Sequence, residues 1–188
     1  MPHYLLYKPF GYLSQFKRGP QKRRKKLLGE LFDFAEGTMA IGRLDEASEG
    51  LLLLSTDGME SERIRQGSFP KQYWVQVDGN IQTAAIEKLR NGIEINIHGQ
   101  YYTTQKCRVE KLDTPPILPP RSKPVRSDRH GPSSWINITL TEGKFRQIRK
   151  MTAAVGHPTL RLVRHSIGIL NLADMQPGQV IEVSKLLP

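Results

Sequence analysis

Cysteine is nearly absent from this sequence: Cys107 is the only one in 188 residues, so no disulfide can form within the chain. Such sparse use is typical of proteins that work in a reducing cytoplasm. Lys106 and Arg108 flank this cysteine and could lower its thiol pKa. However, no CxxC pair or neighbouring histidine supports a reactive thiol. The pattern favours a strand residue in a cytoplasmic protein.

Long apolar runs are also missing. No segment approaches the roughly 18 apolar residues that a membrane-spanning helix requires. No charged leader precedes an apolar stretch at the start of the sequence, which argues against a signal peptide. We therefore expect neither a membrane protein nor a secreted one.

Motifs for metals and nucleotide cofactors are absent as well. The histidines show no ligand spacing and no cysteine cluster accompanies them; they are His3, His98, His130, His157 and His165. The carboxylates Asp45, Glu46 and Glu49 lack the alternation of a calcium loop. No glycine-rich segment could cradle a phosphate group. The sequence thus predicts chemistry that needs neither a metal nor a nucleotide cofactor.

Acidic residues are outnumbered, since 18 Asp+Glu face 28 Lys+Arg and the net charge is +10. This excess indicates a polyanionic partner, with RNA or DNA ahead of a membrane surface. Seven cations fall within residues 17–26, and others gather further along the chain, at Arg121, Lys123, Arg126, Arg129, Arg146, Arg149, Lys150, Arg161 and Arg164. Any one of these runs could simply be solvated. Together they predict a positive rim around a cleft that binds a phosphate backbone.

Hydrophobic periodicity predicts an α+β protein with a mixed, mostly antiparallel sheet flanked by helices. Alternation over 71–78 places Tyr73, Val75 and Val77 on one face of a strand. Asp57 and Glu60 form a capping-box pattern. Other strands are expected over 3–7, 39–42, 51–55, 93–97, 101–112, 135–140, 159–163 and 180–183, and helices over 27–34, 57–65, 83–90 and 144–155. The helix over 144–155 would place Arg146, Arg149 and Lys150 on one basic face.

Charge meets a buried strand at residues 42–50, whose sequence is GRLDEASEG. Four leucines, 51–54, follow directly and predict a fully buried strand. Burying an ionised Asp45 beside such a strand is costly unless a cation or several hydrogen-bond donors meet it. Charge placed where a packed core would exclude it marks a candidate site.

Four segments, in this order, resemble the RNA pseudouridine synthases of the ribosomal small-subunit synthase A type and their large-subunit relatives. They are LYKPFG at 6–11, the stretch from GRLD at 42–45 through Gly58, KQY at 71–73, and the stretch from EGK at 142–144 through Gly168. Four ordered motifs across nearly the whole chain are far more specific than any one of them. The Pro- and Arg-rich insertion before Trp135 most resembles the large-subunit members that act on 23S ribosomal RNA.

The resemblance implies a pseudouridine synthase fold with a central catalytic cleft, in one domain over 1–188 made of two closely packed halves. Many relatives carry a further N-terminal RNA-binding module, which we do not expect here. The basic stretch 17–26 and the insertion 114–134 would then take a larger part in docking. The resemblance also implies a cofactor-free isomerisation of one uridine in 23S ribosomal RNA, or in a large-subunit precursor, by a monomer.

The resemblance implies a role for each matching residue. Asp45 would be the essential catalytic residue, either attacking C1′ or removing the 2′ proton, and Arg149 would form a salt bridge with it. Tyr73 would stack on the target uracil and take part in the final deprotonation of C5. Leu44 and Ile148 would line the pocket, and the residues expected to bind RNA are Arg43, Lys8, Lys71, Arg146, Lys150, Arg161 and Arg164.

Three other interpretations stay open at this point. The chain could be a synthase that acts on 16S ribosomal RNA. It could also be a non-catalytic RNA-binding or ribosome-assembly factor on the same fold, although such a protein has little use for a buried ion pair. A basic protein that associates with membranes is disfavoured, because no basic amphipathic helix with a broad apolar face is evident.

Overall fold

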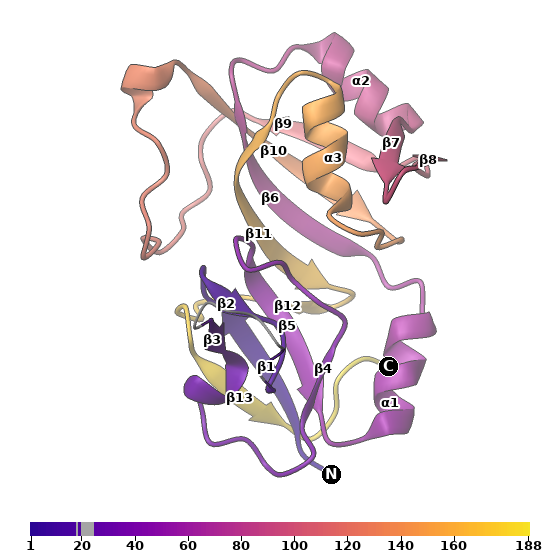
Figure 1. Cartoon of the computed structure of the whole chain (residues 1–188), viewed down its shortest axis with the longest axis vertical. Coiled ribbons are helices and arrows are strands. Elements are labelled where there is room, and N and C mark those ends of the chain that lie inside the picture. The colour runs from indigo at the N-terminus through magenta and orange to yellow at the C-terminus, as the bar shows by residue number, and fades with distance from the viewer. Residues whose placement is uncertain (18, 20–24) are drawn as a thin grey trace. The chain divides into compact units, whose positions relative to one another are not determined.

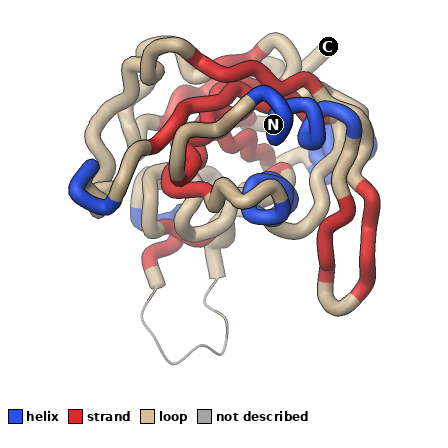
Figure 2. Tube along the Cα trace, turned by 90° about the horizontal axis from the view of Figure 1, so that it is seen from above, coloured by secondary structure: helices blue, strands red, loops and turns tan. Residues whose placement is uncertain are grey.

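The chain folds into two compact units in a computed structural model that describes residues 1–17, 19 and 25–188. The first unit comprises Met1–Phe69 and Arg164–Pro188, and the second comprises Pro70–Val163. Figure 1 labels the elements along the chain, and Figure 2 shows that strands make up most of the regular structure. The class is mixed α and β with a mostly antiparallel sheet, which confirms the sequence prediction.

The first unit is built on strands whose central member, β5, is buried along its whole length. The strands are β1 (His3–Lys8), β4 (Met39–Ile41), β5 (Glu49–Ser55), β12 (Leu170–Asn171) and β13 (Val180–Val183). β1 pairs antiparallel with both β13 and β5, and β4 pairs antiparallel with β5. The four leucines 51–54 are fully buried, as their unbroken apolar run predicts.

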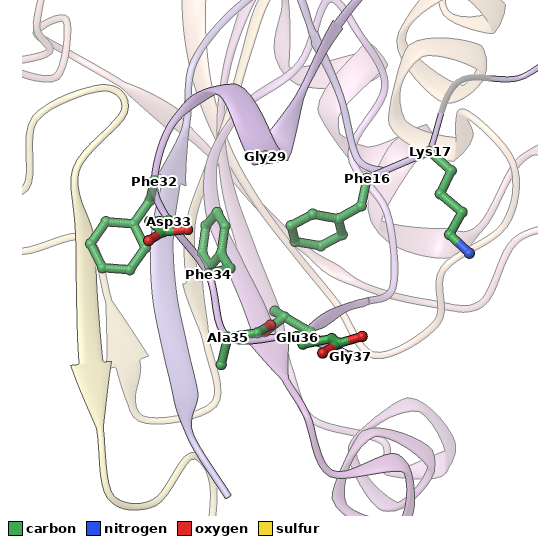
Figure 3. Close-up of a pocket in the computed structure, with 10 residues that line it drawn as sticks. Phe16, Lys17, Gly29, Phe32, Asp33, Phe34, Ala35, Glu36 and Gly37 are labelled. Atoms are coloured by element: carbon green, nitrogen blue, oxygen red, sulfur yellow. The ribbon is translucent and has the colours of Figure 1, made fainter.

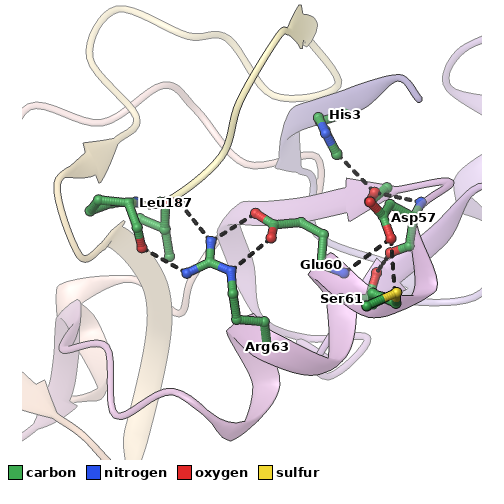
Figure 4. Close-up of polar contacts among 9 residues, drawn as sticks. His3, Asp57, Glu60, Ser61, Arg63 and Leu187 are labelled. Carbon is green, nitrogen blue, oxygen red and sulfur yellow. Dashed lines mark hydrogen bonds and ion pairs between the residues drawn. The ribbon is translucent and has the colours of Figure 1, made fainter.

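Helix α1 (Gly58–Gln66) follows β5 and begins at a side-chain cap (Figure 4). The Asp57 carboxylate accepts hydrogen bonds from Met59 N at 2.9 Å and Glu60 N at 3.1 Å. The second half of the expected capping box does not form, because Asp57 N donates to Ser55 Oγ instead. Glu60 turns away to Arg63, whose guanidinium also donates to the Leu187 carbonyl and so fastens the C-terminal segment to α1.

The second unit is a curved set of strands with two helices. Its elements are β6 (Lys71–Asp78), α2 (Thr83–Asn91), β7 (Glu94–Ile97), β8 (Gln100–Thr103), β9 (Arg108–Leu112), η2 (Asp128–His130), β10 (Ser133–Leu140) and α3 (Gln147–Ala154). β10 pairs antiparallel with β6 on one side and β9 on the other. Tyr73, Val75 and Val77 are the buried face of β6, which confirms the alternation read from the sequence. Strand β11 (Thr159–Ile167) begins in this unit and ends in the first.

The expected helix over 27–34 was wrong. That stretch starts as the end of β3 (Lys26–Leu27), which pairs with β2 (Tyr12–Leu13), and continues as one 3-10 turn, η1 (Leu28–Glu30). Its aromatic residues explain the difference. Phe34 packs edge-on against Phe32 and against Tyr4 of β1, and the Phe32 ring lies tilted against Tyr4. Tertiary aromatic contacts here override the helical spacing of the apolar residues.

The helix expected over 144–155 begins three residues late, at Gln147. The reason is Arg146, whose φ of 50° is left-handed and cannot continue a right-handed helix backwards. Arg146 therefore precedes α3. The prediction that it shares a helical face with Arg149 and Lys150 was wrong.

Most of the basic stretch 17–26 lies outside the described residues. Among the described residues, no helix is long and apolar enough to cross a membrane.

Candidate active site

The turn that carries Asp45 is fixed by hydrogen bonds on both sides. Before it, Ser14 Oγ accepts from Leu44 N at 2.9 Å and donates to Leu44 O at 2.8 Å. After it, Ser48 N donates to Asp45 O at 3.0 Å. Leu44 is buried and Asp45 is half-buried, whereas Arg43 is exposed. The carboxylate is thus held by a short turn between an exposed arginine and the buried strand β5.

Lys8 lies fully buried at the end of β1, in the first unit beside this turn. Its Nζ donates to Pro9 O at 2.9 Å and to Tyr12 O at 2.7 Å. Burial lowers the pKa of Lys8 to about 7, although the carboxylates of Glu49, Asp45 and Glu46 oppose the shift. This burial leaves little surface of Lys8 for a phosphate group, and its expected contact with RNA stays a prediction. The Lys8 side chain holds the main chain of residues 9–12, and Gly11 N in turn donates to Glu46 O at 2.8 Å in the turn that carries Asp45.

Replacing Lys8 with Met is expected to remove a pH dependence of stability. Unfolded lysine titrates near 10.4, so between about pH 7 and about pH 10 the unfolded chain holds a proton that folded Lys8 has released. The free energy of unfolding of the wild type should therefore rise with pH in this window, by about 1.4 kcal/mol per pH unit at most, relative to Lys8→Met. Urea unfolding at several pH values between about 7.5 and about 9.5 measures this difference. A difference that does not change with pH would contradict the assignment.

Like Lys8, two arginines that were expected to bind RNA are buried, and both lie on β11. Arg164 donates from Nε to Leu51 O at 2.7 Å within the first unit. Arg161 donates from Nη2 to Pro119 O at 2.8 Å within the second unit. Each guanidinium thus holds a neighbouring main chain, and its burial leaves little surface for a phosphate group. Their expected contacts with RNA stay predictions.

The second unit supplies the remaining predicted residues. Tyr73 is buried on β6 opposite Ile138 of β10. Ile148 is buried in the first turn of α3, and Arg149 follows it, half-buried. Lys71 Nζ donates to Thr141 O at 3.3 Å. All four of these residues lie on regular elements, Lys71 and Tyr73 on β6 and the other two on α3. Their assembly with Asp45 into one active site stays a prediction.

The insertion before β10 extends away from its two flanking strands (Figure 1). Two of the four cationic side chains expected to face RNA from this insertion instead bond to groups in or beside the insertion itself. Arg126 forms an ion pair with Asp78 and donates to His130 O at 2.7 Å, and Arg121 donates to Lys123 O at 2.5 Å. Lys123 and Arg129 are exposed. The sequence could not separate the arginines that brace this loop from the cations that face solvent.

A polar network before α3 was not predicted from the sequence. Glu142 accepts hydrogen bonds from Tyr102 OH at 2.5 Å, Gln105 N at 2.9 Å and Gln147 Nε2 at 2.5 Å. Gln147 in turn accepts from Lys144 N at 3.0 Å. The Glu142–Gly143 pair signals the turn in the sequence, but its three partners come from other elements. The network fixes the entry to the helix that carries Arg149.

Two further features do not fit a catalytic role. Burial raises the pKa of the Cys107 thiol to about 11, and its Sγ donates to Leu89 O at 3.3 Å, so this cysteine is not an activated nucleophile.

A pocket of about 610 Å³ in the first unit has aromatic walls, including Phe16, Phe32 and Phe34 (Figure 3). None of the predicted site residues lines it. No group of three or more His, Cys, Asp or Glu in the described part of the chain could hold a metal ion.

A family model described as RNA pseudouridylate synthase matches residues 2–154 of this chain. The chain belongs to this family. Its relatives include ribosomal large subunit pseudouridine synthase E of Xanthomonas campestris pv. campestris, 45% identical over 179 residues, which cover 93% of this chain and 91% of the relative. The protein of the same name from Vibrio parahaemolyticus is 44% identical over 178 residues, 94% of this chain and 71% of the relative.

Solved structures agree on the fold of this pseudouridylate synthase. A crystal structure of a pseudouridylate synthase matches with a TM-score of 0.76 at 22% identity, covering 97% of this chain and 70% of the other. Human RNA pseudouridylate synthase domain containing 1 matches with a TM-score of 0.54 at 14% identity, covering all of this chain and 80% of the other. These likenesses confirm the predicted fold class, and the family match confirms the predicted enzyme class.

Proposed function

We propose that this enzyme isomerises one uridine of 23S ribosomal RNA to pseudouridine, with Asp45 as its essential catalytic residue. The observation that carries the proposal is the carboxylate of Asp45, half-buried on a fixed turn beside the buried Lys8, in a chain of this family. The two relatives named as large subunit synthases, which share 44–45% of their aligned residues with it, support the substrate. The 16S interpretation loses its support for the same reason.

The reaction needs no redox partner. The bond between C1′ and N1 breaks, the uracil turns, C5 bonds to C1′, N1 gains a proton and C5 loses one. Atoms and electrons balance within the nucleoside, so a cofactor has no step to perform. Asp45 acts either by attacking C1′ or by removing the 2′ proton, and both routes need an ionised carboxylate.

The other groups bind and orient. Arg149 is proposed to pair with Asp45 and keep it charged, since an adjacent guanidinium favours the ionised form of a carboxylate. Tyr73 is proposed to stack on the uracil and to take part in the deprotonation of C5, over a pocket floor of Leu44 and Ile148. Because one chain carries all of these residues, we expect it to act as a monomer.

Reaching C1′ in structured RNA requires the nucleotide to leave its stack, at a cost of a few kcal/mol. Arg43 is exposed and is proposed to enter the stack where the uridine leaves. Lys71, Arg146 and Lys150 are proposed as phosphate contacts, since none of the three is buried. Lys8, Arg161 and Arg164 are reassigned to positioning roles because of their burial.

Mapping pseudouridine in ribosomal RNA from cells with and without this enzyme tests the proposal. We expect one site in 23S RNA to lose its pseudouridine and the purified enzyme to release tritium from 5-tritiated uridine in a 23S transcript. Loss of a 16S site would overturn the substrate. RNA binding without tritium release would favour a non-catalytic assembly factor.

A further inference from the structure

An exposed aromatic pair lies at the start of α3 in the second unit. The Phe145 ring stacks on the His98 ring, with centroids 4.7 Å apart and planes at 29°. His98 occupies the turn between β7 and β8, and β7 packs beside α3 (Figure 1). Phe145 keeps 51% of its surface exposed, so burial against His98 does not account for a large apolar ring at this position.

Cations surround this pair. Lys150 Nζ lies 5.9 Å from the centre of the Phe145 ring, and Lys144 Nζ lies 4.8 Å from the centre of the neighbouring Tyr102 ring. Arg146, which follows Phe145 directly, is exposed. Aromatic faces set among lysines and arginines bind single-stranded nucleic acid, because bases stack on the rings while the cations hold phosphates.

The main chain at this pair has an unusual conformation and is held by hydrogen bonds. His98 and Arg146 have φ values of 51° and 50°, and only Ala173 shares this conformation among the described residues other than glycine. Each such residue costs of the order of 1 kcal/mol. At His98 the two-residue hairpin turn that it forms with Gly99 requires the positive φ, whereas Arg146 lies in no hairpin turn. The Glu142 network holds Gln147 and, through it, Lys144 N, so the segment 144–146 is held in place before RNA arrives.

We propose that His98, Phe145, Lys144, Arg146 and Lys150 form a stacking platform for an unpaired RNA base next to the target uridine. The proposal rests on the proposed function and names a contact of that same enzyme. Its place follows from the chain, since Phe145 lies just before α3 and Arg149 lies in the first turn of that helix. The base stacks on the exposed part of the Phe145 ring, and the lysines meet its flanking phosphates.

Phe145→Leu tests the platform, because leucine keeps an apolar side chain and removes the ring. With a 23S transcript carrying 5-tritiated uridine, we expect KM to rise about tenfold while kcat stays within about twofold. Phe145→Tyr should restore the wild-type KM, since it restores a ring. Phe32→Leu is the matched control, because Phe32 is also exposed but lies in the first unit.

The salt dependence of binding separates stacking from charge. Filter binding of the same transcript at several salt concentrations should give an unchanged slope for Phe145→Leu, and a slope smaller by about 1 for Lys144→Ala. His98→Gly gives a second variant that removes the supporting ring and tolerates the positive φ. We expect it to weaken binding in the same way.

Equal KM values for Phe145→Leu and Phe32→Leu, or a failure of tyrosine to restore KM, would overturn the platform. The binding assay does not depend on turnover, so it also separates the two proposals. If the wild type releases no tritium, the proposed function falls. The platform then stands if Phe145→Leu still weakens binding at constant salt slope, and falls if binding is unchanged.

Discussion

Replacing Asp45 with Asn is expected to abolish pseudouridine formation while RNA binding stays close to that of the wild type. The amide has the shape of the carboxylate but can neither attack C1′ nor accept the 2′ proton, so both candidate routes fail. We expect tritium release to fall roughly 10⁴-fold or more, down to the background of the assay. Filter binding of the 23S transcript should change by less than about threefold, because Asp45 contributes no attraction to phosphate.

Glu46→Gln is the matched control for this experiment. Glu46 lies next to Asp45 in the same turn and forms an ion pair with Lys25 at 2.6 Å, with 40% of its side chain exposed. Its neutralisation removes the same charge from the same turn and leaves the candidate catalytic group in place. We expect it to keep most of the activity. If Asp45→Asn kept wild-type turnover, or if both variants lost activity equally, Asp45 would not be the catalytic residue.

The sequence was sufficient where one physical rule determines a segment. Alternation in β6 needs only a half-buried strand, and the run of leucines in β5 needs only a fully buried one, so both were predicted with their inward faces. Local rules failed where a distant contact decides the structure. The aromatic contacts of Phe32 and Phe34 with Tyr4 cross nearly thirty residues of sequence, and no local pattern shows them.

In the candidate site, too, local sequence patterns predicted some features and missed those that depend on distant contacts. The Asp45 turn was predicted as a site because charge beside a buried strand is unusual at the level of sequence, and its catalytic role stays a prediction. The burial of Lys8 and Arg164 was not found, because a lysine or an arginine has the same sequence signal whether it faces water or a main-chain carbonyl. A count of basic residues therefore overstates the RNA-binding surface. Part of the positive charge of this enzyme is internal and holds the main-chain frame around the Asp45 turn.

Gly50 is the position of that frame where substitution should cost most. It lies in β5 opposite Lys8 of β1, five residues after Asp45, with a φ of 110°. A Cβ added there would lie 2.3 Å from the carbonyl oxygen and 2.6 Å from the amide nitrogen of Arg164. These are backbone atoms of β11, which cannot move aside without breaking the strand pairing. The close approach of the two main chains therefore requires glycine.

Gly50→Ala is accordingly expected to lower the free energy of unfolding by more than about 4 kcal/mol, or to prevent soluble expression. Gly42→Ala isolates the contribution of the close approach. Gly42 also has a positive φ, of 75°, but no atom lies within 4 Å of its added Cβ, so only the conformational cost of about 1–2 kcal/mol applies. Urea unfolding of the two variants measures the difference. Equal destabilisation would mean that β5 and β11 can separate at Gly50, and the tight packing that we ascribe to the strand after the Asp45 turn would be wrong.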